Sequence, residues 1–394
     1  MKRIIVFALG LMLTTGAMAQ DEAPQGYQFT DQKVNPATSV KDQSRSGTCW
    51  AYSCLGFVES EIMKAGGEEL DLSAMWIVRN IYFEKAVKYI RLHGHLNFAV
   101  GGNAGDVITA IRDYGIVPTE VYPGLNYGTE KPYFDEIDAV LKAYVEAVVE
   151  APNKTLTTAW QDGLNGILDA YFGERPETFT YNGKEYTPKS FAESLPFNVE
   201  DYVDLTSYTH HPFYEKFILE IPDNWRWHQQ YNLPLDELMR TLDYAIDNGY
   251  TIEWGADVSE LGFNRTLAIG IIPEDEVESM EGTEAEKWGA LTPAERQRAL
   301  YSFERPVQEK VITQEMRQEA FDNYQTTDDH GMQIVGYAVD QNGTRFYKVK
   351  NSWDVRPPYD GYYYFSRPFV EYKTMSFMLN KNAIPKDIRK KLGL

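Results

Sequence analysis

The sequence predicts an α+β fold, and three segments carry that prediction. Residues 49–62 place apolar side chains at helical spacing, and Gly66-Gly67 ends the run. Residues 330–339 and 346–353 are two strand-like runs, and the turn between them contains Asn342-Gly343, the strongest short hairpin signal. A helix early in the chain and a β-hairpin late in it are therefore both expected.

Further segments have the periodicity or the end signals of regular structure. The acidic, charge-mixed residues 273–320 indicate a solvated helical insertion with no functional site. The other elements expected are helical patterns over residues 73–102, 105–114 and 234–248, a strand over residues 249–258, a helix start at Thr292-Pro293 and a short helix in the basic tail of residues 385–394.

The first residues have the pattern of a secretory signal. Lys2 and Arg3 precede the apolar residues 4–13, and Ala17-Met18-Ala19 is a small-residue cleavage site. The apolar run is short for a membrane span, and no other segment looks transmembrane. We therefore expect residues 1–19 to be a signal peptide, the mature chain to start near Gln20, and the protein to be exported to the periplasm or the extracellular space without stable membrane insertion.

The charge balance excludes one class of partner. The 394 residues have a formal net charge of −20, and −22 remains once the cations Lys2 and Arg3 are removed with the signal. Nucleic-acid binding requires clustered basic residues, so no nucleic-acid partner is expected. The two cysteines, Cys49 and Cys54, lie five residues apart on one helix and point in different directions, so no disulfide is expected and Cys54 is predicted to be a small buried residue.

Cys49 is the candidate nucleophile. It stands at the expected start of a helix, six residues after Gln43. Unpaired N–H groups and the positive end of the helix dipole favour the thiolate at such a position.

A nucleophilic thiol needs a base and the base needs an orienting group, which His330 and Asn351 can supply. If the hairpin turn centres between residues 341 and 342, opposed residues sum to about 683, and Asn351 lies opposite Met332. That register places Asn351 close to His330. Trp353 could then shield the bond between them from water.

These motifs together resemble the active-site segments of papain-like cysteine peptidases. In that family the thiol attacks the peptide carbonyl, while a glutamine side chain and the backbone N–H of the cysteine form the oxyanion hole. The matching residues are Gln43 for the oxyanion hole, Cys49, His330 and Asn351 for catalysis, and Gly101, Gly102 and Trp353 for substrate binding, the two glycines as a ledge for an extended substrate.

The spacing narrows the resemblance to one branch. Cys49 and His330 are 281 residues apart, against about 130–150 in compact papain-like enzymes. The extra segments, in their order, look like the bleomycin hydrolase and aminopeptidase C branch, over roughly residues 35–394. This resemblance implies a papain-like fold with one peptidase domain over residues 20–394. Its parts would be a helical lobe mainly over 35–125, insertions at about 126–325, a β-rich lobe mainly over 250–275 and 326–380, and a tail over 381–394.

The same resemblance implies a function. Members of the branch need no cofactor, remove residues from peptide N-termini, often assemble as homo-hexamers, and hold the C-terminal tail in the cleft, where its carboxylate meets the substrate amine. This sequence departs from the usual pattern at Asp354, where the family has glycine after Asn-Ser-Trp, and at Pro357-Pro358. The export signal is a further departure, since members are typically intracellular.

Three other functions stay open. They are an exported endopeptidase with an open cleft, a non-catalytic peptide-binding relative, and a transglutaminase-like acyl transferase, against which Asn351-Ser352-Trp353 argues. A metal site is not expected, because no carboxylate or cysteine spacing completes one at His93-x-His95 or His210-His211.

Overall fold

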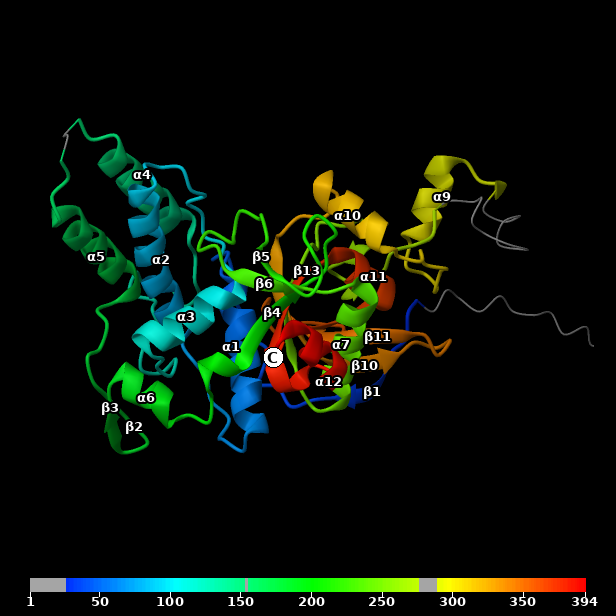
Figure 1. The fold of residues 1–394 in the computed structure, drawn as a ribbon, viewed down its shortest axis with the longest axis horizontal. Helices are drawn as coiled ribbons and strands as arrows, with labels where there is room; N and C mark the ends of the chain where they lie inside the picture. Colours follow the sequence, from blue (N-terminus) through cyan, green and yellow to red (C-terminus); the bar gives the residue numbers. More distant parts are fainter. Residues whose placement is uncertain (1–25, 153–154, 276–288) are drawn as a thin grey trace, which may run out of the picture.

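The computed structural model describes residues 26–152, 155–275 and 289–394 (Figure 1). The predicted signal peptide and residues 276–288 of the acidic insertion lie outside the described residues. Within the described ranges, no helix has the length and apolar character that crossing a bilayer requires.

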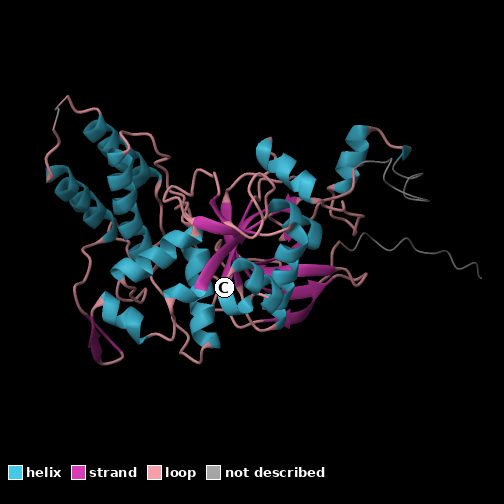
Figure 2. Ribbon diagram, viewed as in Figure 1, coloured by secondary structure: helices cyan, strands magenta, loops and turns pink. Residues whose placement is uncertain are grey.

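One side of the molecule is mainly helical, and a large sheet with further helices around it forms the other side, as Figure 2 shows. A buried apolar core holds the helical side together, with Phe57, Ile77, Val107 and Leu141 among its residues. The helices there are α1 (Cys49–Lys64), α2 (Ala74–Arg91), α3 (Ala104–Tyr114), α4 (Asp135–Val149), α5 (Ala159–Phe172) and α6 (Pro188–Ser194), with the small hairpin β2 (Phe179–Tyr181) and β3 (Lys184–Tyr186) beside α6.

One long mixed sheet forms the other side. Its strand order is β5-β6-β4-β13-β7-β10-β11-β12-β9-β8, and β1 pairs with β10 off this path. The strands are β1 (Thr30–Val34), β4 (Tyr202–Thr206), β5 (Lys216–Ile218), β6 (Gln229–Asn232), β7 (Ile252–Ala256), β8 (Phe263–Asn264), β9 (Ile269–Gly270), β10 (His330–Val339), β11 (Arg345–Lys350), β12 (Tyr362–Ser366) and β13 (Thr374–Asn380). The remaining helices are α7 (Leu235–Asp247), α9 (Pro293–Leu300), α10 (Gln314–Asp322), α11 (Arg367–Lys373) and α12 (Lys386–Leu392), with short 3₁₀ turns at Val199–Asp201 and Lys381–Ala383.

The two faces of β10 meet different partners, because successive side chains of a strand point to opposite faces. Met332 and Ile334 lie in the apolar core shared with α7. Gln333 points the other way and donates to the carbonyl of Gly56 and the hydroxyl of Ser60, both on α1. The central strands therefore lie between α7 and α1, the helix that begins at Cys49.

The hairpin register agrees with the sequence prediction where it matters for the site. Gln333 faces Lys350 and Ile334 faces Val349, so opposed residues sum to 683 at this end. Nearer the turn the sum is 684, and an irregularity between Ile334 and Gly336 absorbs the difference. That irregularity restores the register that brings Asn351 beside the start of β10.

Several expected boundaries differ from the observed ones. The pattern over residues 73–102 ends as a helix at Arg91, and residues 346–353 form a strand only as far as Lys350. The strand expected over residues 249–258 is limited to Ile252–Ala256. Helices α1, α3 and α7 and strand β10 follow their predictions closely, because each has a long apolar pattern and a clear end signal.

Candidate active site

Cys49 is the first residue of α1 and is half-buried. The turn before it requires glycine at position 47, where φ is 62° and a Cβ would lie 2.4 Å from Cγ2 of Val100. This close approach brings the segment that ends in Gly101 and Gly102 against the start of the helix. Cys54 is fully buried one turn further on, and both thiols are free, as predicted.

His330 and Asn351 form the predicted pair. His330 Nε2 lies 2.8 Å from Asn351 Oδ1, and the same oxygen accepts the backbone N–H of Ser352. An amide oxygen can only accept, so Nε2 carries the proton and Nδ1 is left as the basic nitrogen. Trp353 stacks on the imidazole with ring centroids 4.5 Å apart, and the guanidinium carbon of Arg265 lies over the Trp353 ring, 4.5 Å from its centroid. Trp353 therefore covers the His330 ring and is not among the described residues that line the pocket, so its assignment to substrate binding stays a prediction.

Cys49 and His330 line one pocket between α1 and the ends of β7 and β10. Gly102 lines it too, whereas Gly101 lies under the side chain of Asp223. A Cβ at Gly101 would lie 1.9 Å from Oδ2 of Asp223, so the carboxylate sits on the outer part of the predicted substrate ledge. A Cβ at Gly102 would lie 2.9 Å from both Trp50 and Asp106, but Gly102 still lines the pocket.

Gln43 is held close to the catalytic hairpin by Ser352. Its backbone N–H donates to the carbonyl of Ser352 at 2.8 Å, and its Oε1 accepts from the Ser352 hydroxyl at 2.6 Å. The amide oxygen is thereby occupied, which leaves the Nε2 hydrogens as the groups able to donate. Gln43 stands next to Asn351-Ser352 and is not among the residues that line the pocket of Cys49.

Burial and nearby acids oppose a charged resting pair. Burial raises the pKa of the Cys49 thiol to about 12, and the negative charges of Asp328 and Asp223 add to the rise. Burial lowers the pKa of His330 to about 4, although its hydrogen bond to Asn351 works in the opposite direction. The thiol and imidazole are therefore neutral at neutral pH without substrate. Desolvation of Cys49 outweighs the stabilisation of the thiolate that its position at the helix start predicts.

Carboxylates dominate the rest of the pocket. Burial raises the pKa of Glu253, which is 3% exposed, to about 8, although Ser53 donates a hydrogen bond to it at 2.9 Å. Burial likewise raises the pKa of Asp328 well above its usual range, and repulsion from Asp223 adds to that shift. Burial also raises the pKa of Asp223, where the cation Lys85 opposes the rise and repulsion from Asp106 adds to it. A cation that enters the pocket would stabilise the ionised form of each of these acids.

These acids were not predicted from the sequence. Asp328 stands two residues before His330, and Glu253 is the one charged residue in the apolar strand β7, so the sequence contained a signal for both. Asp223 comes from the segment between β5 and β6, and nothing in the local sequence connects it to Cys49.

The C-terminal tail does not lie in this pocket, contrary to what the resemblance implied. Helix α12 packs on α7, where Arg240 pairs with Asp387 and Lys391 with Glu237. Among the described residues that line the pocket, none belongs to residues 381–394.

A half-buried cysteine at a helix start, an imidazole oriented by an amide oxygen, and a glutamine beside them define the class of cysteine-nucleophile hydrolases. The profile of the papain family of cysteine proteases matches residues 23–123 and 293–379. The chain belongs to the papain family of cysteine peptidases.

Relatives place the chain near one branch of that family. Aminopeptidase C of Lactobacillus helveticus is 20% identical over 89% of this chain and 81% of its own length. Bleomycin hydrolase of Gallus gallus is 24% identical over 59% of this chain and 64% of its own length. The crystal structure of PepW from Lactobacillus rhamnosis superposes with a TM-score of 0.68 at 18% identity and covers 92% of this chain and 84% of PepW, which confirms the papain-like α+β fold.

Proposed function

We propose that this papain-family peptidase is an aminopeptidase that removes residues from the N-termini of peptides. The observation that carries the proposal is the position of Asp223 on Gly101, in the pocket that contains Cys49. The names of the similar proteins agree with it.

The first argument is steric. A papain-like substrate would run along the glycine ledge, and the carboxylate of Asp223 occupies the space directly above Gly101. Gly102 lines the pocket together with Cys49. A peptide whose chain continues past Gly101 would collide with Asp223, whereas one whose N-terminus ends there would fit.

The second argument is chemical. Asp328 accepts no hydrogen bond from any described residue, and Asp223 receives only a 3.4 Å contact from Asn97. Gln230 also lines the pocket, is 3% exposed, and its Oε1 has no partner within the described part of the chain. Acceptors without donors fit an ammonium group, which has three N–H donors and no acceptor. A peptide α-ammonium is the ligand of that kind that a peptidase meets.

Binding of the ammonium would also prepare the nucleophile. Asp328 and Asp223 both raise the pKa of Cys49, and a positive charge beside them offsets that effect. Cys49 then attacks the carbonyl as Nδ1 of His330 takes the thiol proton, and Asn351 keeps the imidazole oriented through Nε2.

The remaining steps follow from acyl transfer through a thioester. The backbone N–H of Cys49 and the Gln43 side chain donate to the oxyanion, each contributing roughly 3–4 kcal/mol by comparison with similar sites. His330 returns the proton to the leaving amine and then activates the water that cleaves the thioester. No cofactor takes part in these steps.

The test compares a free dipeptidyl fluorogenic amide with its N-acetylated form. We expect the parent enzyme to cleave only the free amine and Cys49→Ala to cleave neither. Asp223→Asn should raise KM for the free substrate roughly 10- to 150-fold, since a charge-assisted bond of about 1.5–3 kcal/mol is lost. Asp113→Asn, at an exposed acid on α3, is the matched control and should leave KM unchanged.

The outcome also separates the alternatives. Equal cleavage of free and acetylated substrates by the parent would favour an endopeptidase with an open cleft. Full activity in Cys49→Ala would refute the proposed nucleophile, and no turnover with an unreactive Cys49 thiol would favour a peptide-binding protein.

Export and assembly are separate proposals. Export rests on the pattern of residues 1–19, and hexamer formation rests on the resemblance to the branch. N-terminal sequencing of the secreted protein and light scattering test them.

A further inference from the structure

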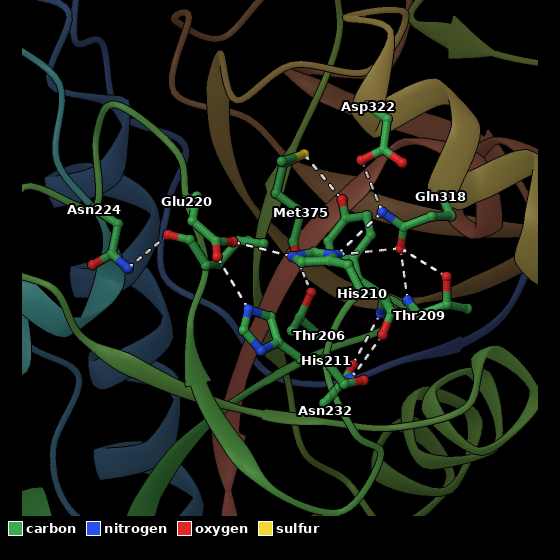
Figure 3. Close-up of polar contacts among 12 residues, drawn as sticks. Thr206, Thr209, His210, His211, Glu220, Asn224, Asn232, Gln318, Asp322 and Met375 are labelled. Carbon is green, nitrogen blue, oxygen red and sulfur yellow. Dashed lines mark hydrogen bonds and ion pairs between the residues drawn. The ribbon is translucent and has the colours of Figure 1, made fainter.

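The structure brings two histidines and a glutamate together at the base of the segment that carries Asp223. His210 and His211 follow β4, and Glu220 follows β5 (Figure 3). His210 Nε2 lies 3.1 Å from one oxygen of Glu220, and His211 Nε2 lies 3.0 Å from the other. The sequence predicts no metal site at His210-His211, because no carboxylate stands at a suitable spacing, but the fold brings the carboxylate of Glu220 there.

We infer that His210, His211 and Glu220 form a binding site for a divalent transition metal ion, for which Zn²⁺ is the best match. Two imidazole nitrogens and one carboxylate are a known zinc ligand set, with bonds of about 2.0–2.2 Å. Tetrahedral coordination at those lengths separates neighbouring ligand atoms by about 3.4 Å. Each imidazole nitrogen lies 3.1 or 3.0 Å from its own oxygen of Glu220, a few tenths of an ångström short of that value. One ligand atom from each of the three residues gives a set within 4.8 Å.

Both rings are held in place by aromatic neighbours. His210 lies parallel to Phe321 with ring centroids 5.6 Å apart, and His211 stacks on Phe217 at 4.3 Å. These contacts keep the two Nε2 atoms directed at Glu220, so a metal ion would need little rearrangement of the side chains.

An outer contact supports the tautomer that metal binding requires. The amide of Gln318 lies against Nδ1 of His210, with its nitrogen at 3.1 Å and its oxygen at 3.3 Å. Without metal, Nε2 donates to the carboxylate and Nδ1 accepts from the amide nitrogen. When a metal takes Nε2, the proton moves to Nδ1, which can donate to the amide oxygen. Thr209 and Asp322 fix that amide at its oxygen and nitrogen respectively.

The position of the site gives it a structural consequence. Glu220 is three residues before Asp223, and Ile221 between them lines the pocket of Cys49. A metal ion bound to Glu220 and to His210 and His211 would restrict the motion of the segment that carries Asp223 over Gly101.

The test measures Zn²⁺ binding by isothermal titration, on untagged protein carrying Cys49→Ala so that the catalytic thiol cannot bind the metal. We expect one ion per chain, at least tenfold weaker binding in His211→Ala and in Glu220→Gln, and a 10–100-fold loss in Gln318→Ala, as for removal of other outer partners of metal ligands. His93→Asn is the matched control, because His93 is exposed at φ 54°, which asparagine tolerates.

Two results would overturn the inference. They are an absence of saturable Zn²⁺ binding in the Cys49→Ala protein, and binding that is as strong in His211→Ala and Glu220→Gln as in the His93→Asn control. Circular dichroism on each variant shows that it is folded, so that a loss of binding reports the ligands.

Discussion

Glu253→Gln should stabilise the protein increasingly as pH rises from 5 to 7. Glu253 is buried on β7 behind Cys49, and its pKa of about 8 compares with 4.5 for an ordinary glutamate. In the unfolded chain the group ionises near pH 4.5, while in the folded chain it keeps its proton until about pH 8. The folded state therefore binds more protons over this range, and its contribution to stability, complete below pH 4.5, is lost as pH rises toward 8.

The magnitude follows from the two pKa values. Integrating the proton linkage between pH 5 and pH 7 gives a loss of about 2.5 kcal/mol in the free energy of unfolding from this group. Glutamine has the shape of the protonated acid and can still accept the hydrogen bond from Ser53, so it removes the titration with little change in packing.

Urea unfolding followed by tryptophan fluorescence at pH 5, 6 and 7 measures the effect. The difference between Glu253→Gln and the parent should grow by about 2.5 kcal/mol across that range. Glu185→Gln, at an exposed glutamate on β3, should give a curve parallel to the parent. Parallel curves for Glu253→Gln and the parent would show that Glu253 is ionised in the folded state, and the account of the acidic pocket would fail.

Two other predictions concern the groups around the site. Ser352→Ala removes the donor that holds the Gln43 amide oxygen, so we expect kcat to fall about tenfold with KM little changed. Ser194→Ala, which loses only a local hydrogen bond to the backbone, serves as the control. An unaltered kcat in Ser352→Ala would exclude Gln43 from the oxyanion hole. Deleting Gly393 and Leu394 should leave the preference for free N-termini intact, because α12 packs on α7; cleavage of acetylated substrates by the truncated enzyme alone would instead restore the tail as the gate.

Local patterns predicted that Cys49, His330 and Asn351 come together, because each lies in or beside an element with its own sequence signal. The helical stripe after Cys49 and the hairpin from His330 fix where these two residues emerge, and period-two alternation fixes Asn351 within one register. The charge state of Cys49 could not be predicted in this way. It depends on desolvation and on Asp223, which approaches through the fold from a segment 174 residues along the chain.

The position of Asp223 changes how the cleft can be restricted. The resemblance assigned that role to a carboxylate at the chain terminus, but the described tail is anchored to α7 by Lys391 and Asp387. A side-chain carboxylate on an inserted segment can block the ledge and attract an ammonium equally well, since both effects depend only on where the charge and the atoms lie.

A side-chain carboxylate differs from a terminal one in how it is held. The segment from Glu220 to Asp223 is internal, and His210 and His211 hold it at its start. A change in the contacts of His210 and His211 with Glu220 would shift Asp223 relative to Gly101. The preference for free N-termini should therefore be coupled to these two histidines. Asp223→Asn and His211→Ala should then show non-additive effects on KM for free-amine substrates, and additive effects would mean that the two histidines do not position Asp223.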